Sequence, residues 1–391
     1  MLKCRFLKEK AMEKRFVYAD NGASAPVSDR VLNAMLPFFK EQYGNPSAVH
    51  SQGREVRRAV ENSRKVIAEC LNCLPSEVIF TSGGTESDNT AILSVLKLGR
   101  GHIITTAVEH KAVLEPCREL ERCGFRVTYL KPDSSGMISA EQVRNAFEDD
   151  TVMVSIMTAN NEVGTLLPIK DIGRLCREKG VIFHTDAVQA VGKVKIDVKE
   201  MCIDMLSVSG HKINAPKGIG ALYIRDGAGF SPHIYGGGQE KGRRSGTENV
   251  PGIVALGEAV KAACEDMEKK CGYVSGLRDK LIAGLEGLGG RLNGGRENRL
   301  CGNASVSFEG YESETLLLML DMRGVCASGG SACSSGTGKI SHVLEALGMS
   351  EERARGTLRF TLAEENTWKD VDYIISSMED CLTRLKRLKE V

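Results

Sequence analysis

Short apolar runs alternate with longer amphipathic stretches along the middle of the chain. The short runs are rich in β-branched residues, which is typical of buried strands, and we expect strands at Glu77–Thr81, His102–Thr106, Val152–Met157, Val181–His184 and Met205–Ser209. The longer stretches repeat apolar residues at helical spacing, and we expect helices at Glu86–Lys97, Val113–Cys123, Ser139–Phe147 and Ile169–Lys179. This alternation predicts an α/β fold whose mainly parallel sheet lies between helices. Ligands of such sheets bind beyond the carboxyl ends of the strands.

The second half of the chain shows a different pattern. A helical segment is predicted from about Pro251 to Leu288, followed by a strand at Ala304–Phe308 and a closing amphipathic helix at Val371–Lys386. A chain of 391 residues exceeds the usual size of a single core. We therefore expect two domains that change near Asp266: a large one over residues 18–266, and a smaller α/β one built from residues 1–17 and 267–391.

Charge and hydropathy narrow the choice of partners. The 52 basic residues nearly balance the 51 acidic ones, so nothing in the charge favours nucleic acid or an anionic membrane. The basic N-terminus lacks the apolar centre of a signal peptide, and the longest apolar run, Leu316–Leu320, is too short to cross a bilayer. We expect a cytoplasmic protein with no membrane or direct nucleic-acid partner.

The thirteen cysteines are odd in number and irregularly spaced. Without a secretory signal, this argues against a disulfide framework, and we expect most of them to be small buried hydrophobic residues. Cys70 and Cys73 form a single CxxC motif. A zinc site would need a second pair of ligands at suitable spacing, so packing is the favoured interpretation and no metal is expected.

The run TSGGTESDN, Thr81 to Asn89, leads from an expected strand through two glycines into an expected helix. Free backbone N–H groups, the positive end of a helix dipole and the Thr85 hydroxyl suit a bound anion such as phosphate. The run lacks the P-loop lysine and the glycine spacing of a dinucleotide site, which disfavours a nucleotide. A capped strand–helix turn is the alternative.

Two titratable residues follow later strands. A buried carboxylate at Asp186 needs a partner, which a protonated pyridine nitrogen would supply; a helix N-cap is the alternative. Lys212 lies in a tight turn, SGHK, between two apolar strands. Burial there lowers the pKa of a lysine and makes it a competent amine for a Schiff base, whereas a solvated loop lysine fits poorly. Ser209 and His211 flank it and are suited to bind phosphate.

Two further loops carry candidate chemistry. The run RRSGTEN, Arg243 to Asn249, has the arginines and hydroxyls of a phosphate site, although its spacing alone favours a charged surface loop. In ASGGSACSSGTG, Cys333 is surrounded by Gly, Ser and Thr, with no apolar neighbour to bury it. A thiol in such a loop is the best candidate for a nucleophile among the cysteines.

Taken in order, these motifs resemble those of the pyridoxal-phosphate-dependent cysteine desulfurases, the NifS/IscS-like group of class V aminotransferases. The resemblance runs from YADNGASAPV at Tyr18 through YGNPSAVH to TLRFTLAEENT at Thr357. It includes TSGGTESDN, EHKAV, NNEVG, TDAVQAVGK, SGHKINAPKGIGA, RSGTEN and SGGSAC. NGASAPV departs from the family's usual NAATTPV by small-for-small changes, and the loop after Cys333 keeps the longer length of this group. The resemblance implies the type I fold of pyridoxal-phosphate-dependent transferases.

The resemblance also implies roles for single residues. Lys212 matches the Schiff-base lysine, and Cys333 matches the cysteine that becomes a persulfide when L-cysteine is converted to L-alanine. His110 matches the histidine stacked on the cofactor ring. The remaining matches are Asp186 for the pyridine nitrogen, Gln189 for the phenolic oxygen, Gly84, Thr85, Ser209 and His211 for the phosphate, Thr247 for a phosphate contact from the second subunit of a homodimer, and Asn161 and Arg359 for the substrate carboxylate.

The family resemblance leaves three functions open. A cysteine desulfurase would pass sulfur to a protein acceptor, such as an iron–sulfur scaffold, or to a thiolation reaction. A selenocysteine lyase or an aminotransferase is the second possibility, but an aminotransferase has no need of the thiol at Cys333. The third is a catalytically silent scaffold, which the presence of Lys212, Asp186, His110, Arg359 and Cys333 argues against.

Overall fold

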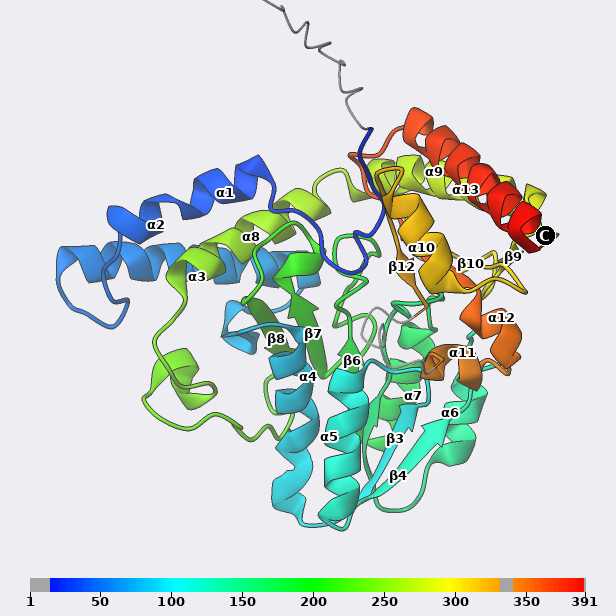
Figure 1. Cartoon of the computed structure of the whole chain (residues 1–391). Helices are drawn as coiled ribbons and strands as arrows, with labels where there is room; N and C mark the ends of the chain where they lie inside the picture. The colour runs from blue at the N-terminus through cyan, green and yellow to red at the C-terminus, as the bar shows by residue number, and fades with distance from the viewer. Residues whose placement is uncertain (1–14, 331–339, 390–391) are drawn as a thin grey trace, which may run out of the picture.

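A seven-stranded sheet and a four-stranded sheet organise the described residues, beside a third sheet of two strands (Figure 1). The computed structural model describes residues 15–330 and 340–389. The larger sheet has the strand order β2-β8-β7-β6-β5-β3-β4, and only β8 runs against the others. Its strands are β2 Val78–Thr81, β3 His102–Thr106, β4 Arg126–Leu130, β5 Thr151–Ser155, β6 Ile182–Asp186, β7 Met205–Ser209 and β8 Gly220–Ile224. The expected mainly parallel sheet is confirmed.

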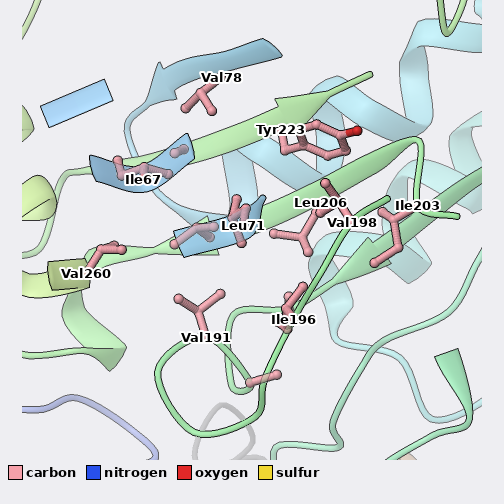
Figure 2. Close-up of a cluster of buried hydrophobic side chains, with 14 of the residues drawn as sticks. Ile67, Leu71, Val78, Val191, Ile196, Val198, Ile203, Leu206, Tyr223 and Val260 are labelled. Carbon is pink, nitrogen blue, oxygen red and sulfur yellow. The ribbon is translucent and has the colours of Figure 1, made fainter. Parts of the chain in front are cut away.

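Helices cover both faces of this sheet, as the alternation predicts. One face packs against α3 (Ser51–Leu71), α6 (Ala140–Ala146), α7 (Ile169–Lys179) and α8 (Val250–Cys264) in the largest hydrophobic cluster. Figure 2 shows part of it, where Ile67 and Leu71 meet Leu206 and Tyr223. The other face packs against α4 (Gly84–Leu93) and α5 (Lys111–Arg122). The helices α1 (Asp29–Met35) and α2 (Pro37–Lys40) lie outside this layer, beside α8.

The smaller sheet is antiparallel, in the order β12-β13-β10-β9. Its strands are β9 Arg291–Leu292, β10 Asn303–Ser307, β12 Ser328–Gly329 and β13 Thr357–Thr361, and its helices are α9 Met267–Gly287, α10 Ser313–Asp321, α11 His342–Ala346, α12 Glu351–Arg355 and α13 Trp368–Lys389. A separate hydrophobic cluster, mainly from α9, α10, α13 and these strands, forms its core. Within it, β1 (Val17–Tyr18) pairs with β11 (Val325–Cys326). The described residues thus contain two separate hydrophobic cores, and the division into two domains stays a prediction.

The prediction of one continuous helix from Pro251 to Leu288 is wrong, because two helices occupy this segment. The segment breaks between Cys264 and Met267, and Asp266 adopts a left-handed backbone with φ of 52°. A left-handed residue cannot continue a right-handed helix, so the chain changes direction there. The break coincides with the predicted change of domain.

The expectation about disulfides also needs correction. Cys70, at the end of α3, forms a disulfide with Cys264, the last residue of α8. The two residues are 194 positions apart, and the packing of α3 against α8 brings them together. The other nine cysteines among the described residues are free, but only Cys117, Cys176 and Cys381 are buried, so the expectation that most cysteines are buried is wrong. The residues described hold no cluster of three or more potential metal ligands.

No helix among residues 15–330 and 340–389 has the length and apolarity needed to cross a bilayer.

Candidate active site

A cavity of about 540 Å³ opens at the carboxyl edge of the large sheet. This volume is within the range of small-molecule and cofactor sites. Loops after β2, β3, β5, β6 and β7 line it, as expected for a parallel sheet. Of the twelve site residues the sequence predicts, ten line this cavity: Gly84, Thr85, His110, Asn161, Asp186, Gln189, Ser209, His211, Lys212 and Arg359.

Lys212 ends the short 3₁₀ turn Gly210–Lys212 that follows β7. Its ammonium donates hydrogen bonds of 2.7 Å to the Gly22 carbonyl oxygen and 2.8 Å to that of Ala23. Burial lowers the pKa of Lys212 to about 8, and the positive charges of Arg359 and Lys193 act in the same direction. An amine with this pKa is partly neutral near physiological pH, so it can act as a nucleophile or a base.

Asp186 is the last residue of β6, and its side chain is buried. Its Oδ1 accepts a hydrogen bond of 2.8 Å from the backbone N–H of Val188. Burial raises the pKa of Asp186, while the Val188 bond and the nearby His110 and Lys212 oppose that rise. A buried carboxylate on which burial and nearby positive groups have opposite effects suits a cationic partner, and a protonated pyridine nitrogen would be one.

His110 begins α5 as its N-cap, and its Nδ1 accepts a hydrogen bond of 3.1 Å from the Ala112 backbone N–H. This contact fixes the ring and leaves Nδ1 unprotonated. Burial lowers the pKa of His110, so the ring is neutral at physiological pH. A neutral, oriented imidazole on the cavity wall is suited to lie against an aromatic ring.

The glycine pair at the start of α4 would let a phosphate group approach the backbone closely. A Cβ atom on Gly84 would lie 2.7 Å from Val188 Cγ2, so no larger residue fits without a shift. Ser209 and His211 line the same region from the loop after β7. Burial lowers the pKa of His211 to about 4, so its imidazole is neutral and keeps one N–H to donate. These groups fit a phosphate at the N-terminus of α4.

Arg359, on β13 of the smaller sheet, reaches into the cavity from the opposite side. Its guanidinium donates to the Asn161 carbonyl oxygen at 3.0 Å and pairs with Asp20 at 3.2 Å. Its Nε is buried and has no hydrogen-bond partner among the described residues. A buried arginine with an unused donor suits a carboxylate ligand. Asp20 could not be predicted as its partner, because the two residues are 339 positions apart.

Two predicted residues remain, Thr247 and Cys333. Thr247 is exposed in the isolated chain, as a residue that serves a second subunit would be. Cys333 falls in residues 331–339, outside the described part of the chain. The residues that follow that segment are tied to the cavity: the Ser341 hydroxyl donates to Glu162, and His342 contacts the Glu109 carbonyl oxygen at 2.9 Å.

The arginines of RRSGTEN bind partners within the chain. Arg244 forms a two-point ion pair with Glu86 at 2.9 and 3.2 Å, and Arg243 donates to the Ser76 carbonyl oxygen at 2.6 Å. Glu86 also accepts from the Ser82 backbone N–H at 2.8 Å. Arg244 therefore fastens the loop to the start of α4, and Arg243 fastens it to the turn before β2, roles that spacing could not reveal.

The donor set of the cavity fits pyridoxal phosphate. It offers an amine for the aldehyde, a buried carboxylate for the ring nitrogen, a neutral imidazole for the ring face and a helix N-terminus for the phosphate. Gln189 also lines it, and its amide donates to the Gly22 carbonyl oxygen at 3.0 Å.

Comparison with known proteins agrees with this geometry. The model of the class-V aminotransferase family matches residues 17–374. Cysteine desulfurase IscS of Methanosarcina thermophila is 47% identical over 380 residues, covering 96% of this chain and 94% of that protein. Cysteine desulfurase NifS of Azotobacter vinelandii is 46% identical over 377 residues, covering 95% and 94%.

Solved structures show the same similarity. A NifS-like protein superposes with a TM-score of 0.90 at 40% identity, covering 94% of this chain and all of that one. SspA in complex with cysteine superposes with a TM-score of 0.77 at 41% identity, covering 90% and 99%. The chain therefore has the fold of the pyridoxal-phosphate-dependent NifS-like enzymes and belongs to the class-V aminotransferase family, within its cysteine desulfurases.

Proposed function

We propose that this pyridoxal-phosphate-dependent enzyme is a cysteine desulfurase that converts L-cysteine to L-alanine and leaves the sulfur as a persulfide on Cys333. The observation that carries the proposal is the cavity in which Lys212, Asp186, His110 and Arg359 converge. The atoms balance: one L-cysteine and one enzyme thiol give one L-alanine and one enzyme persulfide. The curated relatives are named for this activity, and one solved relative is described as a complex with cysteine.

Each group in the cavity has a part in this reaction. Bound pyridoxal phosphate supplies an electron sink for the bond-breaking steps. Arg359 and Asn161 hold the substrate carboxylate, which orients the α-carbon toward Lys212. Because the pKa of Lys212 is about 8, its free amine can take the α-proton near neutral pH. His110, on the cavity wall, would lie against the ring of the bound cofactor and limit its movement.

The sulfur atom leaves the cavity as a persulfide on Cys333. The anchors at Ser341 and His342 hold the C-terminal end of the Cys333 segment at the cavity, which is where the thiol must arrive. We propose a protein acceptor such as an iron–sulfur scaffold, a cytoplasmic location and a homodimer in which Thr247 contacts the phosphate of the other subunit's site.

The test compares Cys333→Ser with Cys123→Ser, a control at an exposed cysteine far along α5. Wild type and Cys123→Ser should produce equal amounts of alanine and sulfide from L-cysteine with a thiol reductant, and should gain the mass of one sulfur atom without it. Cys333→Ser should keep the bound cofactor's visible absorbance and lose both products. Full activity of Cys333→Ser would refute the persulfide step.

A further inference from the structure

Asp88 is a buried carboxyl group that the proposed reaction leaves without a role. It lies on α4, one turn beyond the glycines at its start, and only 1% of the residue is exposed. It lines the same cavity as Asp186. Its Oδ1 receives no hydrogen bond from any donor among the described residues. An ionised carboxylate without donors is costly in the protein interior, so the group needs either a counter-charge or a proton.

No counter-charge is available from the nearest base. His184 Nε2 lies 3.6 Å from Asp88 Oδ1, but the ring is fully buried. Its Nδ1 bonds the Ser155 hydroxyl at 2.8 Å, and its Nε2 bonds that of Ser207 at 3.1 Å. Burial lowers the pKa of His184 to about 3, so the imidazole is neutral at physiological pH. His184 therefore cannot compensate a negative charge on Asp88.

The other carboxyl groups nearby push Asp88 toward its protonated form. Burial is the largest cause that raises its pKa, and the adjacent Asp186 and the buried Glu109 add to it, against a smaller opposing effect of Ser207. Asp88 and Asp186 line the same cavity, and their side chains interact directly. Two buried carboxyl groups in contact cannot both ionise, so they share one proton.

The surroundings decide which of the two keeps that proton. Asp186 accepts the N–H of Val188 and is attracted by His110 and Lys212. Asp88 has no comparable cation, and its Oδ1 has no donor. The charge therefore belongs on Asp186 and the proton on Asp88.

We propose that Asp88 is a neutral positioning residue that donates its proton in a hydrogen bond to Asp186, holding that carboxylate in place for the cofactor's ring nitrogen. The arrangement leaves the negative charge on Asp186 and fixes its orientation. Asp88 acts through Asp186 and does not touch the reacting atoms. The proposal rests on the pyridoxal phosphate site and is independent of sulfur transfer to Cys333.

Two variants at position 88 test whether a hydrogen-bond donor is needed there. Asp88→Asn keeps a hydrogen-bond donor of the same shape, whereas Asp88→Ala removes it. Asp88→Asn should bind pyridoxal phosphate as wild type does, with the same pH midpoint of the visible absorbance. Asp88→Ala should bind it about tenfold more weakly and shift that midpoint, because a hydrogen bond to a charged group is lost. Thermal unfolding of the cofactor-free proteins gives the effect on folding alone.

A second measurement keeps the proposal falsifiable if Asp88→Ala does not fold. The infrared carbonyl band of a neutral carboxylic acid should be present in wild type and weakened in Asp88→Asn. No change in this band, or an absorbance midpoint that Asp88→Ala leaves unaltered, would overturn the role of Asp88. If wild type itself fails to bind pyridoxal phosphate, the proposed function is the part that fails.

Discussion

The amine of Lys212 is held by two neutral carbonyl oxygens, those of Gly22 and Ala23. Neutral acceptors position the amine without the full stabilisation that a carboxylate would give its charge. Burial and the positive charge of Arg359 therefore lower its pKa to about 8. The apolar strands around SGHK predicted this direction from sequence. The two carbonyl partners could not be predicted, because they are 189 and 190 positions away in the chain.

Capture of pyridoxal phosphate by the cofactor-free protein should depend on the pH through this amine. The neutral amine is the nucleophile, so below pH 8 the capture rate should rise about tenfold per pH unit and level off above it. Stopped-flow absorbance of the protein mixed with cofactor measures the rate. Lys212→Arg should show no capture, and a rate that still rises steeply at pH 10 would indicate an ordinary lysine.

Among the elements, the buried strands were predicted better than the edges. All six expected strands are present, five in the large sheet and one in the small sheet, although β6 extends to Asp186, two residues beyond the expected end. The strand β4 was missed, because it lies at the sheet edge and its residues are only partly buried, which weakens the hydrophobic signal. Helical periodicity continues across the break at Asp266, so periodicity alone could not show that α8 and α9 are separate helices.

The Cys70–Cys264 disulfide ties the end of α3 to the end of α8. It closes a loop of nearly two hundred residues, and cross-links of this kind contribute about 2–5 kcal/mol to the free energy of unfolding. Dithiothreitol should therefore lower the urea midpoint of wild type and leave that of Cys70→Ala/Cys264→Ala unchanged. Cys117→Ala, at a free buried cysteine, is the control that keeps the response.

Thiol counting provides a direct check on the same bond. Denatured wild-type protein should expose two more thiols after reduction than before it. Equal counts would mean that both cysteines are free, as expected for a protein kept in a reducing cytoplasm.

At the scale of the whole molecule, the candidate active site takes its residues from both sheets. The large sheet supplies Lys212, Asp186 and His110, and Arg359 comes from the small sheet, so movement between the two would change the distance from substrate carboxylate to base. Thr247 lies on the surface of the single chain, which is why its predicted phosphate contact requires a second subunit.

Mixed dimers should test that contact. Lys212→Ala and Thr247→Ala subunits, carrying different tags, are co-expressed and purified as heterodimers. If Thr247 acts in the neighbouring site, one site of the heterodimer has both native residues and recovers about half of the wild-type activity per dimer, whereas each homodimer variant is weakened. If Thr247 acted within its own chain, no site would be intact and the heterodimer would have no more activity than the weakened Thr247→Ala variant.

By itself, the sequence determined the α/β class and the mainly parallel sheet, and its resemblance to a known family pointed to the ten residues that line the cavity. All of these except Arg359 end or follow strands of the large sheet, whose carboxyl ends meet at one edge, so motifs placed there must converge. Only the tertiary structure decided the partners. The pairs Arg359 with Asp20, Cys70 with Cys264, and Asp88 with Asp186 join residues about 100 to 340 positions apart. Such contacts depend on how helices and sheets pack, and no local pattern of residues encodes that packing.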